Sequence, residues 1–138
     1  MRNFAAAAVV LGTACLAVPA SAVQDTPTTI NGVETVCTGV GSAKDDARWS
    51  AYPVKIVIAN TAGQNLAAMQ ITLSQSGKNL VQTTCDAPWI LFKLPAGQYT
   101  ATATSIGDQP GMTRKADFKT NGTGQQEVTI AFNTPPNQ

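Results

Sequence analysis

The chain has 138 residues, and its nine basic and eight acidic side chains give a formal net charge of +1. Because no stretch gathers the basic residues, the sequence lacks the electrostatic footprint of a nucleic-acid or anionic-lipid partner. Histidine is absent, so a Ser-His-Asp or Cys-His mechanism would lack its base, and zinc sites built from histidine are excluded as well.

The first 22 residues have the pattern of a cleavable secretory signal. A positive start at Arg2 precedes an apolar run, 5–18, and small residues that end at Ala22. The run is shorter than the about 20 residues of a membrane-spanning helix, and no later segment suits a transmembrane anchor. We therefore expect signal cleavage after Ala22 and a periplasmic or secreted protein. A lipoprotein site at Cys15 is disfavoured, because Gly12 stands where a large aliphatic residue is usual.

The 116 residues that follow the cleavage site suit one domain. Residues 23–32 are polar, contain a proline and end in an Asn-Gly turn, so we expect a flexible leader there. The domain is expected to span 33–132, and a flexible tail is expected at 133–138, where proline and polar residues end the chain.

Short alternating runs follow one another through the domain, separated by turn signals about every eight to twelve residues. In the clearest run, Met69, Ile71 and Leu73 alternate with polar residues, which is typical of a sheet with one face in water. The runs, in chain order, are 33–38, 52–60, 66–74, 80–84, 89–94, 99–104, 112–119 and 128–132. They predict an all-β fold, an antiparallel sandwich of seven or eight strands.

One short helix is expected between the first two runs, near residues 43–50. Ser42-Ala-Lys-Asp45 resembles a capping box, in which two side chains satisfy the backbone N–H groups that open a helix. The charged side chains of this helix would face water, and Trp49 would pack inward. The adjacent carboxylates Asp45 and Asp46 lack the ligand spacing of an EF-hand, so we expect no metal site.

Two cysteines lie beyond the signal, Cys37 and Cys85. An even number of cysteines in an exported chain favours a disulfide, and closing the loop between them would add about 4 kcal/mol of stability. Two buried free thiols are the alternative. Two thiolates are too few for a four-thiolate zinc site, and we expect no cofactor.

A hairpin signal follows the second cysteine, in the run Leu94-Pro95-Ala96-Gly97-Gln98-Tyr99. Pro95 presets its φ, Gly97 permits a positive φ, and Tyr99 would start the next strand facing the core. This Leu-Pro-x-Gly-x-Tyr pattern resembles the carboxypeptidase regulatory-like (prealbumin-like) domains. Together with Ala87-Pro-Trp, it is similar to small exported bacterial proteins of that kind.

The resemblance covers roughly residues 33–132 and implies a prealbumin-like sandwich. It implies no peptidase, because the regulatory-like module is an appendage of those enzymes and their catalytic domain is separate. A transthyretin-like hydrolase is also disfavoured, since that activity relies on histidines. We therefore expect that the chain is not an enzyme.

Four aromatic residues are the candidates for binding: Trp49, Tyr52, Trp89 and Phe92. They can form a platform for a sugar ring or a peptide, or they can pack the core, which is the commoner use of large aromatic side chains. Trp89 is the strongest candidate, because it follows Ala87-Pro88 near a predicted corner. Lys55, out of phase with the apolar positions of its run, is expected to face water.

The function expected from these observations is that of an exported, non-catalytic binding or structural module. It would contact an envelope protein or a glycan through its loops or a free sheet edge. The alternative is a carbohydrate-binding accessory domain that uses exposed tryptophan side chains.

Overall fold

The computed structural model describes residues 24–60, 68–106 and 112–132. The predicted signal at 1–22, the disfavoured lipoprotein site at Cys15 and the predicted tail at 133–138 lie outside these residues and stay predictions. No helix among the described residues is long and apolar enough to cross a membrane.

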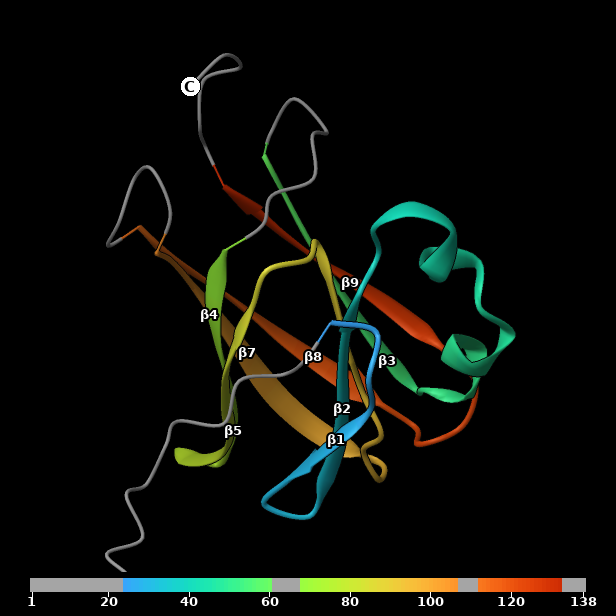
Figure 1. Ribbon diagram of the computed structural model, residues 1–138. Helices are drawn as coiled ribbons and strands as arrows, with labels where there is room; N and C mark the ends of the chain where they lie inside the picture. The colour runs from blue at the N-terminus through green and yellow to red at the C-terminus, as the bar shows by residue number, and fades with distance from the viewer. Residues whose placement is uncertain (1–23, 61–67, 107–111, 133–138) are drawn as a thin grey trace, which may run out of the picture.

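The described residues form two sheets packed face to face, which confirms the predicted all-β sandwich (Figure 1). One sheet has the strand order β1-β2-β6-β3-β9, and the other has the order β5-β4-β7-β8. The strands are β1 (Thr28–Ile30), β2 (Val33–Thr38), β3 (Val54–Asn60), β4 (Met69–Gln75), β5 (Lys78–Cys85), β6 (Trp89–Phe92), β7 (Gly97–Ser105), β8 (Thr113–Thr120) and β9 (Gln126–Phe132).

The strand that sequence analysis did not predict is β1, which lies inside the expected flexible leader. Asn31 and Gly32 have positive φ values of 49° and 81°, and Ile30 pairs with Val33. A two-residue Asn-Gly loop with two positive φ angles connects antiparallel strands well, so the turn brings residues 28–30 back against β2. The description of residues 23–32 as a flexible leader is therefore wrong for this part of the segment.

The sheets are not purely antiparallel, which corrects a second expectation. β9 pairs with β3 in parallel, in a register that runs from Val54 opposite Gln126 to Asn60 opposite Phe132. The remaining strand pairs are antiparallel. A parallel pair needs a long connection, and here the connection consists of all the strands between β3 and β9.

The helix expected near residues 43–50 is instead two short 3-10 turns, η1 (Gly41–Asp45) and η2 (Ala47–Ala51). The predicted capping box does not form, because the residue that precedes η1 is Val40 and no side chain caps the turn. Asp46 ends η1 and caps η2, where its side chain accepts a hydrogen bond from the Arg48 backbone N–H at 2.9 Å. Asp46 has an extended backbone, which breaks the segment into two turns.

The main core lies between the sheets and is built from alternate residues of their strands. Its largest fully buried side chains include Phe92, Phe132, Ile56 and Ile71. A second, smaller apolar cluster lies on the outer face of the five-stranded sheet and contains Val36, Trp49, Tyr52, Leu91 and the partly buried Trp89. The 3-10 turns therefore cover part of this outer face, and Figure 1 shows them outside the sheet that contains β3 and β9.

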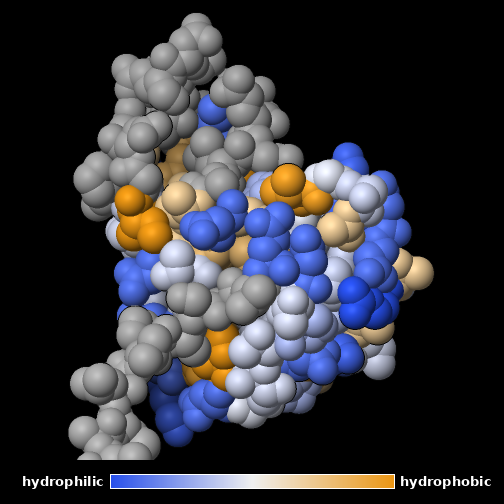
Figure 2. All heavy atoms as spheres, in the orientation of Figure 1, coloured by the Kyte–Doolittle hydropathy of each residue, from blue (hydrophilic) through white to orange (hydrophobic). Residues whose placement is uncertain are grey.

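The outer face of the four-stranded sheet is polar. Its central strands β4 and β7 place Thr72, Thr100, Thr102 and Thr104 on this face, half-buried among one another. Figure 2 shows a described surface that is largely hydrophilic or intermediate in this view, with separate hydrophobic spots. Val40 and Ile106 are the large hydrophobic residues that the described part of the chain exposes.

Candidate functional site

A pocket of about 200 Å³ lies on the outer face of the five-stranded sheet, beside the 3-10 turns. We call it the Trp89 pocket. Its walls come from η1 and η2, from β3 and β6, and from the loop before β9. The lining residues are Lys44, Asp45, Asp46, Trp49, Ser50, Lys55, Trp89, Leu91 and Gln125. The pocket thus combines an apolar floor with charged and hydrogen-bonding groups.

Trp89 is the first residue of β6, and this half-buried residue lines the pocket. The ammonium nitrogen of Lys55 lies over one face of the indole ring, 3.5 Å from its centroid. Gly39 contacts the same indole closely, since a Cβ at Gly39 would lie 2.7 Å from the Trp89 Cγ. Gly39 follows β2 and Lys55 lies in β3, the two neighbours of β6, so the ring is held from both sides of its strand.

Lys55 does not simply face water, which corrects the expectation from its phase in the strand. It is on the outer face as predicted, but its ammonium lies over the Trp89 ring, and its side chain is 16% exposed. Its Nζ lies 3.5 Å from Oε2 of Glu127, the residue opposite it on β9, whose side chain is 58% exposed. The site therefore contains a partly buried cation with a long ion pair.

Trp49 is the anchor of the turns rather than an exposed platform. It is 4% exposed, and its indole N–H donates to the Ala43 carbonyl at 2.6 Å. The Gln125 amide donates to the Trp49 carbonyl at 2.7 Å, which ties the loop before β9 to η2. The Arg48 guanidinium lies 4.8 Å from the centre of the Trp49 ring. Trp49 thus shapes the wall of the pocket, while its ring is committed to packing.

Tyr52 and Phe92 lie outside the pocket. Phe92 belongs to the main core and is fully buried, so a ligand on the surface cannot reach it. Tyr52 is also buried and packs edge-to-face on Trp49, with ring centroids 6.0 Å apart. Of the four predicted aromatic candidates, the structure therefore brings Trp89 and Trp49 to one pocket and places the other two elsewhere.

Tyr52 belongs to a small cluster of polar groups beside the pocket. Burial first, and a hydrogen bond with Glu34 second, raise the pKa of Tyr52 well above its ordinary value. The hydrogen bond with Lys93, followed by the bond with Tyr52, lowers the pKa of Glu34. The Lys93 ammonium lies 2.8 Å from Glu34 and 4.9 Å from the centre of the Tyr52 ring.

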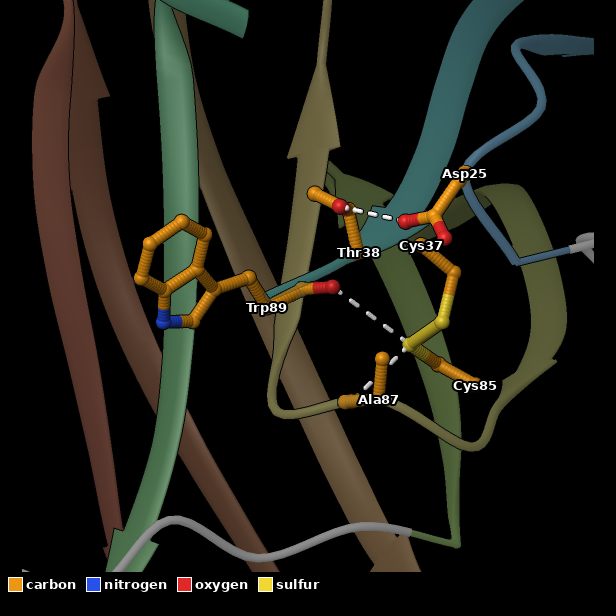
Figure 3. The surroundings of a disulfide bond; sticks show 6 residues. All are labelled: Asp25, Cys37, Thr38, Cys85, Ala87 and Trp89. Carbon is orange, nitrogen blue, oxygen red and sulfur yellow. Dashed lines mark hydrogen bonds between the residues drawn. A yellow bond between two sulfur atoms is a disulfide. The ribbon is translucent and has the colours of Figure 1, made fainter. Parts of the chain in front are cut away.

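The predicted disulfide between Cys37 and Cys85 is confirmed. It joins β2 of one sheet to the end of β5 in the other, so it crosslinks the sandwich. The Cys85 sulfur lies 3.1 Å from the Ala87 carbonyl oxygen and 3.5 Å from that of Trp89. Figure 3 shows the Trp89 indole directed away from the disulfide while its carbonyl faces the sulfur. The crosslink therefore supports the backbone from which the pocket residue projects.

The segment Leu94–Tyr99 does not form the predicted hairpin: β6 and β7 belong to different sheets, so the chain crosses here from one sheet to the other. Tyr99 is buried, as predicted, and its hydroxyl donates to the Pro95 carbonyl at 2.8 Å. Gly97 does not have a positive φ; it opens β7, and a Cβ there would lie 3.0 Å from the Gln75 amide nitrogen. A side chain at this position would therefore require a small shift of the Gln75 amide, and the backbone conformation does not require glycine. Leu94 lies in the main core.

A second hollow of about 340 Å³ lies along the loop between β8 and β9, and it contains no residue that sequence analysis selected. Its walls are polar and include Lys119, Asn121 and Gln125, the last of which also lines the Trp89 pocket. Within the described ranges, no group of three or more Cys, Asp or Glu side chains could hold a metal ion.

Lys55 and Gln125 belong to the site, although the sequence did not identify them as site residues. The alternation of β3 predicted the face of Lys55, but its neighbours on that face come from distant segments. Gln125 lies in a loop, and its contact with Trp49 spans 76 residues. No local pattern indicates such a contact.

No protein-family model matches the chain, and no curated protein sequence matches it. Among solved structures, the chain is similar to a 5-hydroxyisourate hydrolase of Klebsiella pneumoniae. The two share 16% identity with a TM-score of 0.44, over 62% of this chain and 87% of that chain.

This match contradicts the expectation that the chain is not an enzyme, because the matched chain bears the name of a hydrolase. The expectation that the chain is not an enzyme therefore no longer stands. The absence of histidine still removes mechanisms that need a histidine base, and it says nothing about other chemistry.

Proposed function

We propose that this chain is an exported binding module that contacts an envelope protein or a glycan through the Trp89 pocket. The observation that carries the proposal is the pocket itself, in which segments far apart in the chain place charged, polar and aromatic groups around one hollow. Convergent polar groups beside apolar and aromatic side chains are typical of ligand sites.

Export is supported by the disulfide, because such bonds persist in oxidising compartments. Kinship with the small exported carboxypeptidase regulatory-like proteins is supported by the crossover at Leu94–Tyr99, which contains the Leu-Pro-x-Gly-x-Tyr pattern. There the Tyr99 hydroxyl donates to the carbonyl four residues upstream, as in the tyrosine corner of other β-sandwiches.

Of the two classes of partner, the pocket favours a glycan, which is also the second function expected from the sequence. Its volume of about 200 Å³ has room for one ring-sized group but not for the surface of a folded partner. Ser50 and Gln125 offer hydroxyl and amide groups to sugar hydroxyls, and Trp89, one ring face of which Lys55 covers, forms part of the wall. Trp49 contributes to the wall from within the fold.

Isothermal titration of the mature protein against a panel of envelope oligosaccharides tests the proposal. We expect one ligand to bind and the Ser50→Trp variant, which fills the pocket from its exposed rim, to lose at least tenfold in affinity. Thr102→Ala, on the outer face of the other sheet, is the control and should bind as the wild type does. Unchanged binding by Ser50→Trp, with an unchanged circular-dichroism spectrum, would place the binding surface elsewhere. If no glycan binds, affinity capture from envelope extract by the wild type and Ser50→Trp side by side tests the protein partner.

A further inference from the structure

We infer that the Trp89 pocket selects a sugar that bears a carboxylate, such as a uronic acid, and that Lys55 binds this carboxylate. The inference rests on the proposed function and narrows it to a ligand class. It follows from a comparison of the three places on this face of the molecule where a cation lies against an aromatic ring.

Each of the three cations has a carboxylate partner, but the pairs differ in length. Arg48 lies against Trp49 and pairs with Asp46 at 2.8 Å, and Lys93 lies against Tyr52 and pairs with Glu34 at 2.8 Å. Charge-assisted hydrogen bonds have lengths of about 2.7 to 2.9 Å, so the two charged groups in each of these pairs are in direct hydrogen-bond contact. Lys55 is 3.5 Å from Glu127, beyond this range.

The Lys55 side chain is nevertheless the least exposed of the three. It is 16% exposed, against 62% for Arg48 and 45% for Lys93. A partly buried ammonium carries three donors, and an indole face attracts its charge without accepting a strong hydrogen bond. A long ion pair therefore leaves Lys55 with unused capacity for an anion, and Lys55 is the one of the three cations that lines the pocket.

The other charges of the pocket do not compete for the ligand. Both oxygens of Asp46 accept from Arg48, so this carboxylate is already neutralised. Lys44 and Asp45 are exposed at the rim, where water screens them. Glu127 is 58% exposed, so its side chain can turn into water when a ligand carboxylate takes its place beside Lys55.

A saccharide fits the rest of the pocket better than an acidic peptide. The carboxylate of a uronic acid is attached directly to the sugar ring, so ring and charge fit together in about 200 Å³. The hydroxyls of the same ring then lie within the space bounded by Ser50 and Gln125. A peptide would place one side chain in the pocket and leave its backbone outside.

Calorimetric titration with an oligogalacturonate, the neutral galactose oligomer of the same length and a glutamate-rich peptide tests the inference. We expect the oligogalacturonate to bind at least tenfold more tightly than the neutral oligomer, with affinity that falls as salt is added. Lys55→Met keeps the apolar stem over Trp89 and should abolish this preference, whereas Lys55→Arg should keep part of it. Glu127→Gln removes the competing carboxylate and should tighten binding several-fold. Lys93→Met is the matched control and should change nothing.

The possible results distinguish a failure of this inference from a failure of the proposed function. Equal binding of acidic and neutral oligomers, unaffected by Lys55→Met, overturns the inference while the binding module stands. Tighter binding of the peptide than of the oligogalacturonate overturns the choice of a saccharide. Loss of the preference in Lys93→Met as well would show that general surface charge is responsible, which also overturns the role of Lys55. If no oligomer or peptide binds and Ser50→Trp changes nothing in any assay, the proposed function itself fails.

Discussion

At the level of single residues, the orientation of the Trp89 indole depends on Gly39 as much as on Lys55. Gly39 has a φ of 110° and lies so close to the ring that a Cβ would come within 2.7 Å of it. A side chain at this position would be strained by its backbone and would displace the indole from the pocket wall. Position 39 therefore fixes the orientation of the residue on which the proposed site relies.

We expect Gly39→Ala to lower the free energy of unfolding by about 3 kcal/mol, the combined result of backbone strain and overpacking. Gly41→Ala is the matched control, because Gly41 also has a positive φ, of 64°, but has open space around it. It should cost about 1 to 2 kcal/mol. Urea denaturation followed by tryptophan fluorescence measures both. Equal losses in the two variants would mean that contact with Trp89 contributes nothing.

The second prediction concerns the hydroxyl group of Tyr99. It donates to the Pro95 carbonyl at 2.8 Å and thereby ties the turn before β7 to the strand itself. Tyr99→Phe keeps the ring, which stacks on Phe118 at 5.8 Å between centroids, and removes this hydrogen bond together with the one between the hydroxyl and the Gln75 side chain. We expect a loss of about 1 kcal/mol, measured as a shift in the urea midpoint with an unchanged m-value. A variant as stable as the wild type would show that water replaces both bonds fully.

At the scale of elements, the two 3-10 turns give the sandwich a cover on one outer face. Trp49 and Tyr52 enter the apolar cluster on this face together with Val36 and Leu91 from the sheet. The cover is held by buried rings rather than by backbone hydrogen bonds to a strand. In addition, the Tyr52 hydroxyl bonds with Glu34 of β2, so the attachment depends in part on the protonation of Tyr52.

We expect alkaline pH to destabilise the fold in part through Tyr52. The pKa of Tyr52 is raised in the folded protein, so the unfolded chain loses this proton first, near its ordinary value of 10.0. Stability is then complete below that pH and falls as the pH rises above it, because ionisation favours the unfolded state. Urea midpoints measured from about pH 8 to pH 11 should fall less steeply for Tyr52→Phe than for the wild type. Parallel curves would contradict a role for this hydroxyl.

Alternation predicted the inner and outer faces of β3, β4 and β7 correctly, because one face of each strand is in the core. It could not predict that the two 3-10 turns cover part of the outer face of the five-stranded sheet. The run Trp89–Phe92 is continuously apolar, which indicates a strand buried on both faces, yet nothing local tells which segment lies on its outer side. The same limit applies to Lys55: its phase predicts the face, while its exposure depends on Trp89 and on turns formed by residues 41–51.

The short elements were the hardest to predict for another reason. β1 has three residues, too few for an alternating pattern, and the structure pairs it through the Asn31-Gly32 turn. The segment at 43–50 has charges suited to a helix, but Asp46 adopts an extended conformation and divides it. In both cases tertiary contacts with the five-stranded sheet outweigh weak local preferences.

At the scale of the whole molecule, the Cys37–Cys85 bond is the covalent link between the sheets, and it spans 48 residues of sequence. We expect the double variant Cys37→Ala/Cys85→Ala to lose about 4 kcal/mol, mainly because its unfolded chain is no longer constrained. The measurement is urea unfolding of the variant and of the oxidised wild type. The m-value should rise in the variant, since its unfolded state is more expanded. A loss below about 1 kcal/mol would mean that the unfolded chain is compact with or without the crosslink.

The parallel pairing of β3 with β9 has a consequence for the order of folding. β9 is the last strand of the described residues, so any folding intermediate in which it has not docked leaves one side of β3 with unpaired N–H and C=O groups. In that state the exposed backbone can pair with the same strand of another copy. The five-stranded sheet is complete only when β9 has docked, so the stage before this docking is the one most exposed to aggregation.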